Sequence, residues 1–494
     1  MELRSIIKNT SYIAYSRIIN MLLGIIRSKI SAILIGTIGI GIYQQVNYIT
    51  DFLSNLARLN MNDGFVKIAA ESKDKDNYKS ILSHASITYT YLVSILTLVV
   101  IILGFVFSDK ITIYIFGEEK YLKYYFLSLA SLPILIMNSV SFALLKSHKA
   151  MNYISRANII SSITGLVIFI PLIYYLRITG AVISIVINYI ILFILNNYHA
   201  RTKVLSKINL TVAQIFKGKY SKLYAKTLIN FALFGIIAGS AQLFSEFFTR
   251  SLLVTKFGVD KIGIYSPIIS WVGMLRGIFL PSLSTYLYPR LCEVKSNLEI
   301  KGILNDVIRL STFILIPFIF LGISMRSLLI PLLYSPKFIE ATKYLPYHFL
   351  GTVFFFWWYC IALVLTPTGR IRIHGFFMIC MAITDILVVF FLLPELGMYG
   401  WMLKFIISPF IFFFVYMIFL NRHYGFKIYI RNIMLMSYLM LGIIIILLYE
   451  SKYSNNFILF EIIVALVLTS GVILFLSANE KNIIQTKIKY FLKL

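Results

Sequence analysis

Runs of about twenty apolar residues recur from Ser11 to Ser477, and they limit the folds open to this chain more than any other feature. A helix of about 20 apolar residues crosses the ~30 Å hydrocarbon layer of a bilayer. A membrane β-barrel would instead show segments of ~10 residues with alternating polarity. Because backbone groups in lipid have to be bonded within their own segment, the runs predict helices. We therefore expect an all-α integral membrane protein with about 14 transmembrane helices.

The composition agrees, since 59% of the residues are apolar and only 13% are charged, whereas soluble domains carry about a quarter charged residues. The aromatic run Phe354–Tyr359 is expected at the membrane interface or facing lipid. In chain order, the expected spans cover residues 10–35, 42–68, 81–107, 122–145, 154–176, 179–198, 226–255, 262–289, 304–331, 344–366, 373–393, 397–420, 431–449 and 456–477.

The net charge of +26 could indicate a nucleic-acid-binding protein, but the positions of the basic residues argue otherwise. Most of the 46 Lys and Arg lie in short loops between apolar runs, as topology signals and contacts to lipid headgroups do. We therefore expect membrane lipids, and no nucleic acid, as partners. Loops on the N-terminal side carry more Lys and Arg than the opposite loops, and the number of spans is even. Both termini are therefore expected in the cytoplasm.

Nothing in the sequence indicates an enzyme. The longest loop, from His199 to Ala225, is too short for a soluble catalytic domain, and Walker A, HExxH and GxSxG motifs are absent. Cys292, Cys360 and Cys380 lie in or beside apolar stretches without CxxC spacing, which argues against a metal site. We expect no enzymatic activity, no cofactor and no metal.

An internal repeat is visible in the sequence. Gly36–Tyr43 reads GTIGIGIY, and 222 residues later Gly258–Tyr265 reads GVDKIGIY, with five of eight positions identical. Gly180, before the sixth span, recurs as Gly400 before the twelfth span at an offset of 220. Six spans, an even number, separate the copies, so the two halves have the same orientation. This is the parallel-repeat arrangement of some transporters.

The repeat predicts two six-helix lobes around a central cavity, followed by two additional helices. The expected parts are an N-terminal lobe (1–200), a basic cytoplasmic linker (201–225), a C-terminal lobe (226–425) and a segment with two more helices and a basic cytoplasmic tail (426–494).

A polar stripe runs along the second span, with spacings of 3, 4, 4, 3 and 4 residues. It consists of Gln44, Asn47, Asp51, Asn55, Arg58 and Asn62. At 100° per residue, these side chains fall within about 80° of one another on a helix. Because one charge at the middle of a bilayer costs at least ~2.5 kcal/mol, this face does not contact lipid. It serves either as polar glue between packed helices or as the lining of a water-filled cavity, and its length favours the cavity.

Other charges lie within the first and seventh spans. Arg17, Arg27 and Lys29 in the first span are candidate ligands of a substrate, but they lie near the span ends, where snorkelling to the headgroups is an equal alternative. Glu246 and Arg250 in the seventh span are four residues apart. They are either part of the cavity or a pair that neutralises itself.

Single charges in apolar surroundings are hypotheses for functional sites. Arg276 and Lys404 are such cations, in the eighth and twelfth spans. Because cations outnumber acids across the spans, a shared cavity would be positive and would suit an anion such as phosphate. The planar guanidinium of arginine binds phosphate oxygens in pairs. Asp51, Glu246 and Asp385 are candidates for holding a proton or Na⁺ that couples transport to an ion gradient. For Glu246, a permanent ion pair with an arginine is the preferred alternative.

Three segments resemble a known family. They are the hairpin Leu34–Gln45, the repeated turn Gly258–Tyr265, and Arg276–Ser284, which reads RGIFLPSLS. Together they resemble polysaccharide flippases of the Wzx type, in the multidrug/oligosaccharidyl-lipid/polysaccharide exporter superfamily. The resemblance covers most of the chain, and each motif alone is a loose pattern of glycine and aromatic residues.

The resemblance implies a bacterial inner-membrane protein that moves undecaprenyl-diphosphate-linked oligosaccharide repeat units, of O-antigen or capsule, from the cytoplasmic to the periplasmic leaflet. It implies two lobes around a cationic cavity and alternating access, commonly driven by a gradient of H⁺ or Na⁺. Other membrane proteins of polysaccharide assembly are candidate partners. Related peptidoglycan-precursor flippases use arginines in their first, second and eighth spans. Arg27 near Gly24 and Arg58 before Gly64 match locally, and Arg276 matches less closely.

The sequence leaves two alternative functions, and both are disfavoured. An ion-coupled small-molecule exporter of the same superfamily would be expected to have an acidic and aromatic cavity, which the surplus of Arg and Lys within the spans disfavours. A membrane polysaccharide polymerase usually carries a large periplasmic loop. The longest outer loop here, near Ser108 to Tyr121, is too short for that.

Overall fold

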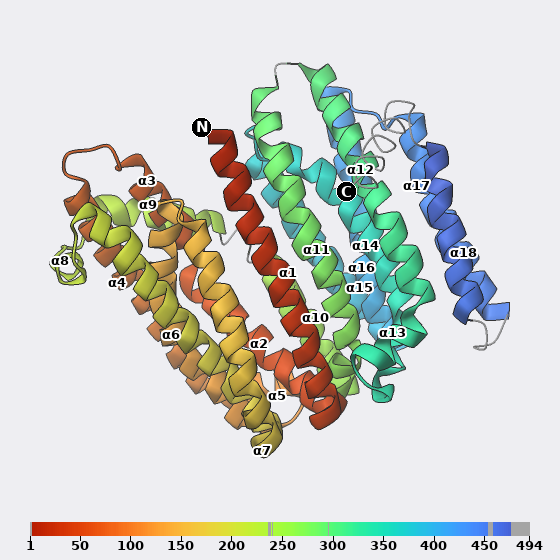
Figure 1. Ribbon diagram of the computed structural model, residues 1–494, viewed down its shortest axis with the longest axis horizontal. Helices are drawn as coiled ribbons and strands as arrows, with labels where there is room; N and C mark the ends of the chain where they lie inside the picture. The colour runs from red at the N-terminus through yellow and green to blue at the C-terminus, as the bar shows by residue number, and fades with distance from the viewer. Residues whose placement is uncertain (1, 236–238, 240, 295, 453–457, 476–494) are drawn as a thin grey trace, which may run out of the picture. The chain divides into compact units, whose positions relative to one another are not determined.

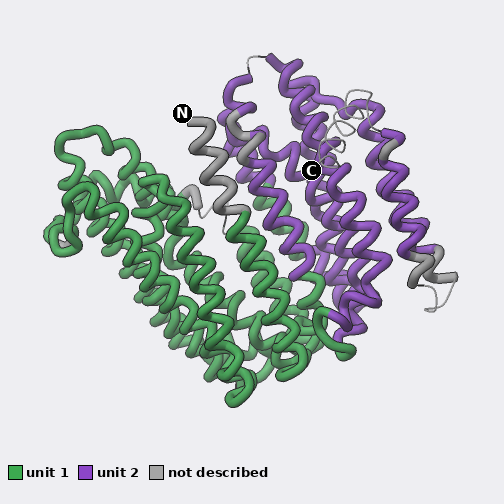
Figure 2. The backbone as a smooth tube through the Cα atoms, in the orientation of Figure 1, with its two compact units in different colours: residues 1–269, 333–337, 378–386 green, residues 270–332, 338–377, 387–494 purple. Residues whose placement is uncertain are grey.

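The computed structural model describes residues 2–235, 239, 241–294, 296–452 and 458–475. The chain divides into two compact units, shown in different colours in Figure 2. Unit 1 comprises residues 1–269, 333–337 and 378–386, and unit 2 comprises residues 270–332, 338–377 and 387–494. The units are defined by packing rather than by the repeat, so the lobes expected at 1–200 and 226–425 remain a prediction.

Every regular element that the structure describes is helical (Figure 1). The elements up to the start of unit 2 are α1 (Glu2–Leu34), α2 (Gly36–Arg58), α3 (Met61–Glu71), α4 (Tyr78–Val106), α5 (Ser108–Phe116), η1 (Glu119–Tyr121), α6 (Leu122–Ser147), α7 (Met151–His199), η2 (Ala200–Leu205), η3 (Ser206–Ile208), α8 (Val212–Phe216), α9 (Lys222–Gly235) and α10 (Ala241–Phe257). They are followed by α11 (Val259–Glu293), α12 (Asn297–Ser324), α13 (Arg326–Leu333), η5 (Pro336–Phe338), α14 (Ala341–Ala362), η6 (Leu363–Leu365), α15 (Ile371–Leu396), α16 (Met398–Tyr424), α17 (Ile430–Lys452), α18 (Ile458–Ser470) and η7 (Gly471–Phe475).

The predicted all-α membrane fold is confirmed. Among the described residues, 9 helices are long and apolar enough to cross a bilayer. The count of about 14 remains a prediction. One reason is that α7 counts as a single helix although its backbone is non-helical at Arg177, between the expected fifth and sixth spans. Another is that α1 and α2 carry too many polar residues to be counted by length and hydropathy alone.

The repeated turn has the same backbone in both copies. Gly36, at the start of α2, has φ 64°, and Gly258, before α11, has φ 81°. Both values lie in the left-handed region, which glycine adopts without steric cost. Beyond these turns, a Cβ atom on Gly263 would lie 1.9 Å from the Thr37 carbonyl oxygen. The two helices therefore cross in backbone contact, which only glycine permits.

Equivalent positions of the two copies meet at this crossing. A Cβ atom on Gly41 would lie 3.2 Å from the backbone nitrogen of Gly263, its counterpart 222 positions later. One turn further on, Gln44 Nε2 donates a hydrogen bond to Ser266 Oγ at 3.1 Å, again between residues 222 positions apart. Contacts between equivalent residues are expected where a local two-fold axis passes between two copies, and they support the duplication.

The second repeated turn also keeps its geometry. Arg177 has φ 53° and ψ −128°, and Gly397, 220 positions later, has φ 57° and ψ −132°. A Cβ atom on Gly180 would lie 1.9 Å from the carbonyl oxygen eight residues earlier, and on Gly400 the same distance would be 2.1 Å. An arginine therefore occupies a conformation in the first copy that a glycine occupies in the second.

The expected second span, 42–68, is not one helix. Helix α2 ends at Arg58 and α3 begins at Met61, because Leu59 and Asn60 have φ values of 42° and 60°. Asparagine tolerates this left-handed conformation better than most residues, and the Leu59 N–H still bonds to the Asn55 carbonyl at 2.8 Å. The prediction that all six stripe residues share one helix face is therefore wrong, since Asn62 lies on α3.

The expected interfacial or lipid-facing position of the aromatic run in α14 is also wrong. Phe356, Trp357 and Trp358 are at most 5% exposed. Trp357 Nε1 donates to Thr312 Oγ1 of α12 at 2.9 Å. Helix α14 packs against α12 and α16, so its aromatic side chains form the interior of unit 2.

Candidate functional site

Helix α2 separates an apolar side from a polar side. Ile42, Val46 and Ile49 are buried, whereas Asp51 and Asn55 are exposed. Polar glue between packed helices would be buried, so this exposure favours the alternative in which the stripe faces water. A charged side chain in contact with lipid costs at least ~2.5 kcal/mol at mid-bilayer, and a wet surface avoids that cost.

Arg58 is the last residue of α2 and is half-buried. Its Nε donates to the Ser54 carbonyl oxygen at 3.1 Å, and its Nη2 lies 3.5 Å from Asn55 Oδ1. It also interacts electrostatically with the exposed carboxylate of Asp51, seven residues earlier in the same helix. The guanidinium is thus held at the end of α2 by its own helix.

The remaining stripe residues have different surroundings. Gln44 bonds to Ser266 at the crossing of the repeats, and the Asn47 amide donates to the Tyr43 carbonyl oxygen of its own helix at 2.9 Å. Asn62 on α3 accepts a hydrogen bond from the Tyr89 hydroxyl, inside the packed part of unit 1. Asn62 therefore fits the glue interpretation, and the structure separates it from the exposed part of the stripe.

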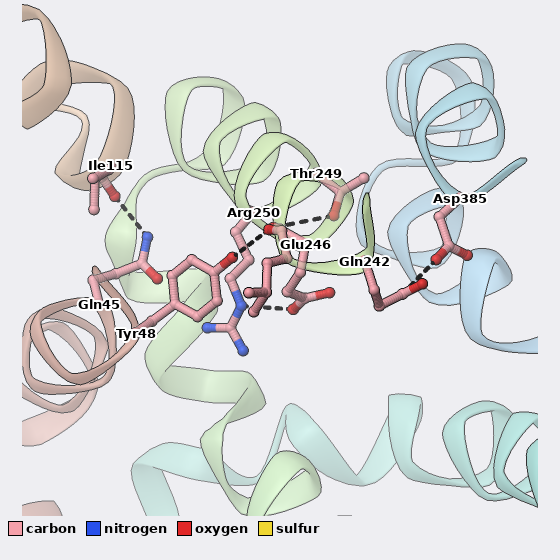
Figure 3. Close-up of polar contacts among 9 residues, drawn as sticks. Gln45, Tyr48, Ile115, Gln242, Glu246, Thr249, Arg250 and Asp385 are labelled. Atoms are coloured by element: carbon pink, nitrogen blue, oxygen red, sulfur yellow. Dashed lines mark hydrogen bonds and ion pairs between the residues drawn. The ribbon is translucent and has the colours of Figure 1, made fainter. Parts of the chain in front are cut away.

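Figure 3 shows a polar cluster between α2 and α10. Arg250 Nε donates to Glu246 Oε1 at 2.6 Å, and these two side chains are 11% and 23% exposed. The Arg250 guanidinium lies 4.6 Å from the centroid of the Tyr48 ring. The Tyr48 hydroxyl donates to the Leu243 carbonyl oxygen at 3.1 Å. The preferred alternative for Glu246, an ion pair with an arginine, is therefore present in the structure.

Asp385 lies within α15 and is 6% exposed. Gln242 Nε2, from α10, donates to Asp385 Oδ2 at 3.0 Å (Figure 3). Both residues belong to unit 1. The contact places a carboxylate and a side-chain amide together at a buried position, and oxygen atoms of these two groups are ligands that hard cations prefer. Within the described ranges, no group of three or more His, Cys, Asp or Glu could hold a metal.

The three candidate substrate ligands in α1 differ in exposure. Arg17 is exposed, and Arg27 and Lys29 are half-buried. The Arg27 guanidinium lies 5.2 Å from the centroid of the Phe169 ring, and a Cβ atom on Gly165 would lie 3.4 Å from Arg27 Nη2. Arg27 therefore rests against α7, which disfavours snorkelling for this residue. For Arg17 and Lys29 both alternatives stay open.

Unit 2 contributes two of the predicted cations. The Arg276 guanidinium, on α11, lies 3.9 Å from the centroid of the Phe355 ring on α14. Lys404, on α16, is 2% exposed. Its Nζ lies 4.8 Å from the Trp401 centroid and 4.7 Å from the Phe405 centroid. Both cations are thus placed on aromatic side chains within the unit.

Sequence reasoning missed one feature of the site, the aromatic rings over which its cations lie. Four predicted cations lie over a ring, in the pairs Arg27 with Phe169, Arg250 with Tyr48, Arg276 with Phe355, and Lys404 with Trp401. A ring face attracts a cation where water is scarce, and the planar guanidinium fork can still bind oxygens in pairs. Two of these rings could have been found from sequence, because Tyr48 follows Gln44 by four residues on the stripe side of α2 and Trp401 precedes Lys404 by three residues in α16.

A family model described as "Polysaccharide biosynthesis protein" matches residues 6–295, which is more than half of the chain. The chain belongs to this family. A comparison with curated protein sequences gives no match for this polysaccharide biosynthesis protein.

Solved structures share its fold. "Lipid II flippase MurJ, inward closed conformation" aligns with a TM-score of 0.69 at 16% identity, over 97% of this chain and 100% of that chain. An inward-facing multidrug resistance MATE family transporter of the MOP superfamily aligns with a TM-score of 0.67 at 14% identity, over 83% and 98% of the two chains. A MOP superfamily transporter from Pyrococcus furiosus aligns at 0.53 with 13% identity, over 85% and 96%. The chain therefore has the all-helical fold of these flippases and transporters.

Proposed function

We propose that this polysaccharide biosynthesis protein is a flippase that carries undecaprenyl-diphosphate-linked oligosaccharide repeat units, of O-antigen or capsule, from the cytoplasmic to the periplasmic leaflet. The observation that carries the proposal is the exposed polar face of α2, where Asp51, Asn55 and Arg58 lie together in a membrane protein. A diphosphate and a glycan cannot cross hydrocarbon unaided, because their charges and hydroxyl groups would lose their hydrogen bonds to water. A wet surface with cations offers them replacement contacts.

The proposed roles follow from charge and geometry. Arg27, Arg58 and Arg250 of unit 1 would contact the diphosphate, because a guanidinium binds phosphate oxygens in pairs. Arg276, in unit 2, is a separate candidate for a phosphate ligand. The exposed Asn55, with its neutral amide, would exchange hydrogen bonds with sugar hydroxyl groups. The structurally similar Lipid II flippase MurJ also acts on a lipid, which supports a lipid-linked cargo here.

Ion coupling is the second part of the proposal. Asp385 and Gln242 would hold a proton or Na⁺, since the carboxylate is buried and accepts a hydrogen bond from the neutral Gln242 amide at 3.0 Å. Asp51 is the alternative acid, because it is an exposed carboxylate on the polar side of α2. Asp385→Asn should reduce the dependence of transport on the ion gradient more than it reduces substrate binding. Unchanged gradient dependence in that variant would exclude Asp385 as the coupling acid.

The test measures which leaflet holds the lipid-linked repeat units. Inner-membrane preparations from cells with and without the gene are probed with a glycan-binding reagent that cannot cross the membrane. Deletion should leave the units on the cytoplasmic side, and the wild type should return them to the periplasmic side. Arg58→Ala should fail to do so at normal membrane levels.

A matched control removes another cation from the same region. Lys67→Ala takes a 52% exposed ammonium from the neighbouring α3, and it should leave delivery unchanged. Normal delivery of units in the deletion strain, with only polymer length altered, would mean that the protein acts after translocation.

The likeness to the multidrug resistance MATE transporter, with a TM-score of 0.67, favours small-molecule export as a second candidate. The deletion strain separates the two functions. An exporter would change the resistance of the cells to cationic compounds and leave the leaflet distribution of lipid-linked units as it is in the wild type.

A further inference from the structure

Helices α16 and α17, the segment between them and Trp357 of α14 line an open cavity of about 870 Å³ in unit 2. Its wall is apolar and includes Phe413 and Met417 from α16 and Ile433, Met440 and Leu441 from α17. The α17 part of the wall, from Ile433 to Leu441, extends about 12 Å along the helix axis at 1.5 Å per residue. Methionine side chains are flexible and adapt to irregular apolar ligands. The cavity therefore suits a long hydrocarbon chain.

The charged end of the cavity lies where α16 passes into α17. Lys427 and Asn421, both exposed, line it there, and Ser437 is the other polar residue of the lining. The stretch from residue 421 to 432 contains Arg422, Lys427 and Arg431 and no Asp or Glu. A ligand that fits both ends of the cavity is thus apolar along its length and anionic at its head.

The segment that carries Lys427 is fixed by a buried amide network. Asn305, on α12, is 1% exposed, and Asn432 is 3% exposed. Asn305 Nδ2 donates to the Lys427 carbonyl oxygen at 3.0 Å, and Asn305 Oδ1 accepts from the Tyr429 N–H at 2.7 Å. Asn432 Nδ2 donates to Asn305 Oδ1 at 3.0 Å. The backbone of Lys427 is therefore held at the mouth of the cavity before any ligand arrives.

We propose that this cavity binds a glycerophospholipid with an anionic headgroup, which places its phosphate at Lys427 and Asn421 and one acyl chain along the wall between α16 and α17. The positive charge of the connecting segment selects this lipid over a zwitterionic one. Each Lys or Arg near an anionic lipid surface contributes about fivefold to binding. The bound lipid would join α17 to α16, and so would attach the first of the two helices outside the repeat.

The test is native mass spectrometry of the full-length protein in a neutral detergent, titrated with phosphatidylglycerol or phosphatidylcholine of identical acyl chains. The wild type should retain one phosphatidylglycerol more strongly than phosphatidylcholine. Lys427→Ala should lower the affinity for phosphatidylglycerol about fivefold and leave that for phosphatidylcholine unchanged. Lys226→Ala, an exposed lysine of unit 1, is the matched control and should change neither affinity.

A second measurement locates the acyl chain. Phosphatidylglycerol with a photoreactive group in its acyl chain should cross-link to peptides that contain Met417 or Met440. Cross-links spread evenly over other helices, or an unchanged affinity in Lys427→Ala, would overturn the proposal. Displacement of the bound phosphatidylglycerol by undecaprenyl phosphate, one for one, would also overturn it, because the cavity would then be a site for a polyprenyl tail.

Discussion

Helices α2 and α11 begin with the same turn in the two copies of the repeat, but they carry different side chains beyond it. Both follow a glycine with positive φ, and both cross at a glycine, Gly41 in one and Gly263 in the other. The polar positions of α2 have apolar or small counterparts 222 residues later. Asn47, Asp51, Asn55 and Arg58 correspond to Ile269, Gly273, Gly277 and Leu280.

This difference separates what the fold requires from what the proposed function requires. Backbone contact at the crossing needs a residue without a Cβ atom in each copy, so both copies have glycine there. Nothing in the crossing needs a polar stripe, and only α2 has one. The stripe is therefore better explained by a ligand than by packing, which each of the following substitutions tests.

The largest expected effect comes from the helix crossing, which both copies of the repeat share. Gly263→Ala places a Cβ atom 1.9 Å from the Thr37 carbonyl oxygen, so the helices have to separate. We expect a loss of about 3 kcal/mol in stability, at the upper end for overpacking a rigid contact. Thermal unfolding in detergent measures it. Gly273→Ala is the matched control in the same helix, since within the described residues a Cβ atom there would have no neighbour within 4 Å. Equal melting temperatures for the two variants would exclude a tight crossing.

The second prediction concerns the part that the copies do not share. Asp51 and Arg58 interact electrostatically, so Asp51→Ala and Arg58→Ala should each lower glycan delivery on the order of tenfold or more, because contacts with charged groups contribute about 1.5–3 kcal/mol. The double variant should be less impaired than the product of the two effects, with a coupling energy of about 1 kcal/mol. The leaflet assay measures all three variants at matched protein levels. Strictly multiplicative effects would mean that the two side chains act at separate places.

Much of the fold could be predicted from the sequence, because an apolar run of the right length leaves few alternatives to a membrane helix. The break between Arg58 and Met61 could not, since the left-handed pair Leu59 and Asn60 leaves almost no compositional signal. The burial of Phe356 and Trp357 was missed for a different reason. Lipid tails are as apolar as a protein interior, so the sequence of an aromatic run does not show whether its side chains contact lipid or protein.

The candidate site was predictable only where its residues share a helix. The shared helix face of Asp51, Asn55 and Arg58 follows from helical spacing, and so does the Glu246 to Arg250 pair. The ring beneath Arg276 comes from another helix, 79 positions later in the chain. No spacing rule within one segment can find such a partner.

Phe355→Leu tests whether that ring orients Arg276, the candidate phosphate ligand of unit 2. Removing the ring face under Arg276 should weaken delivery about fivefold, from ~1 kcal/mol of cation–π attraction. Phe355→Tyr keeps a ring face under Arg276 and should retain the delivery of the wild type. Both variants need normal melting temperatures for the comparison to hold. Equal activity of the Leu and Tyr variants would mean that Arg276 needs no ring.

Arg177→Gly tests the other repeated turn, and the expected effect is an increase in stability. Arg177 occupies a glycine conformation that costs about 1–3 kcal/mol for other residues. Two terms offset part of the gain. The variant loses the Arg177 Nη1 hydrogen bond to the Leu34 carbonyl at 3.3 Å, and glycine loses more backbone entropy on folding. We expect a net stabilisation of roughly 0.5–1 kcal/mol. Gly397→Ala, in the second copy, should instead lower the melting temperature. A lower melting temperature for Arg177→Gly would show that the side chain contributes more than the strain costs.

The smallest expected effect lies at a third pair of equivalent positions, His148 and Thr368, where the two copies make the same contact with different chemistry. His148 Nδ1 lies 3.0 Å from the Leu144 carbonyl oxygen, and 220 positions later Thr368 Oγ1 donates to the Val364 carbonyl oxygen at 2.7 Å. Burial lowers the pKa of His148 from its ordinary value of 6.5, the Leu144 carbonyl opposes this, and the charge of Lys73 adds to the lowering. The second copy has no titratable group at this contact.

The sign of the pH effect follows from the lowered pKa. The folded protein binds the His148 proton less readily than the unfolded chain does, so the stability from the neutral ring is complete above about pH 6.5 and is lost as the pH falls from there towards the folded pKa. Melting temperatures at about pH 7.5 and about pH 5.5 should therefore fall further for the wild type than for His148→Thr, which copies the second repeat. The remaining histidines are the same in both proteins, so they contribute equally to the two falls in melting temperature. Identical falls in melting temperature would show that His148 keeps its ordinary pKa. The contacts made by His148 and Thr368 would then be equivalent in chemistry as well as in geometry.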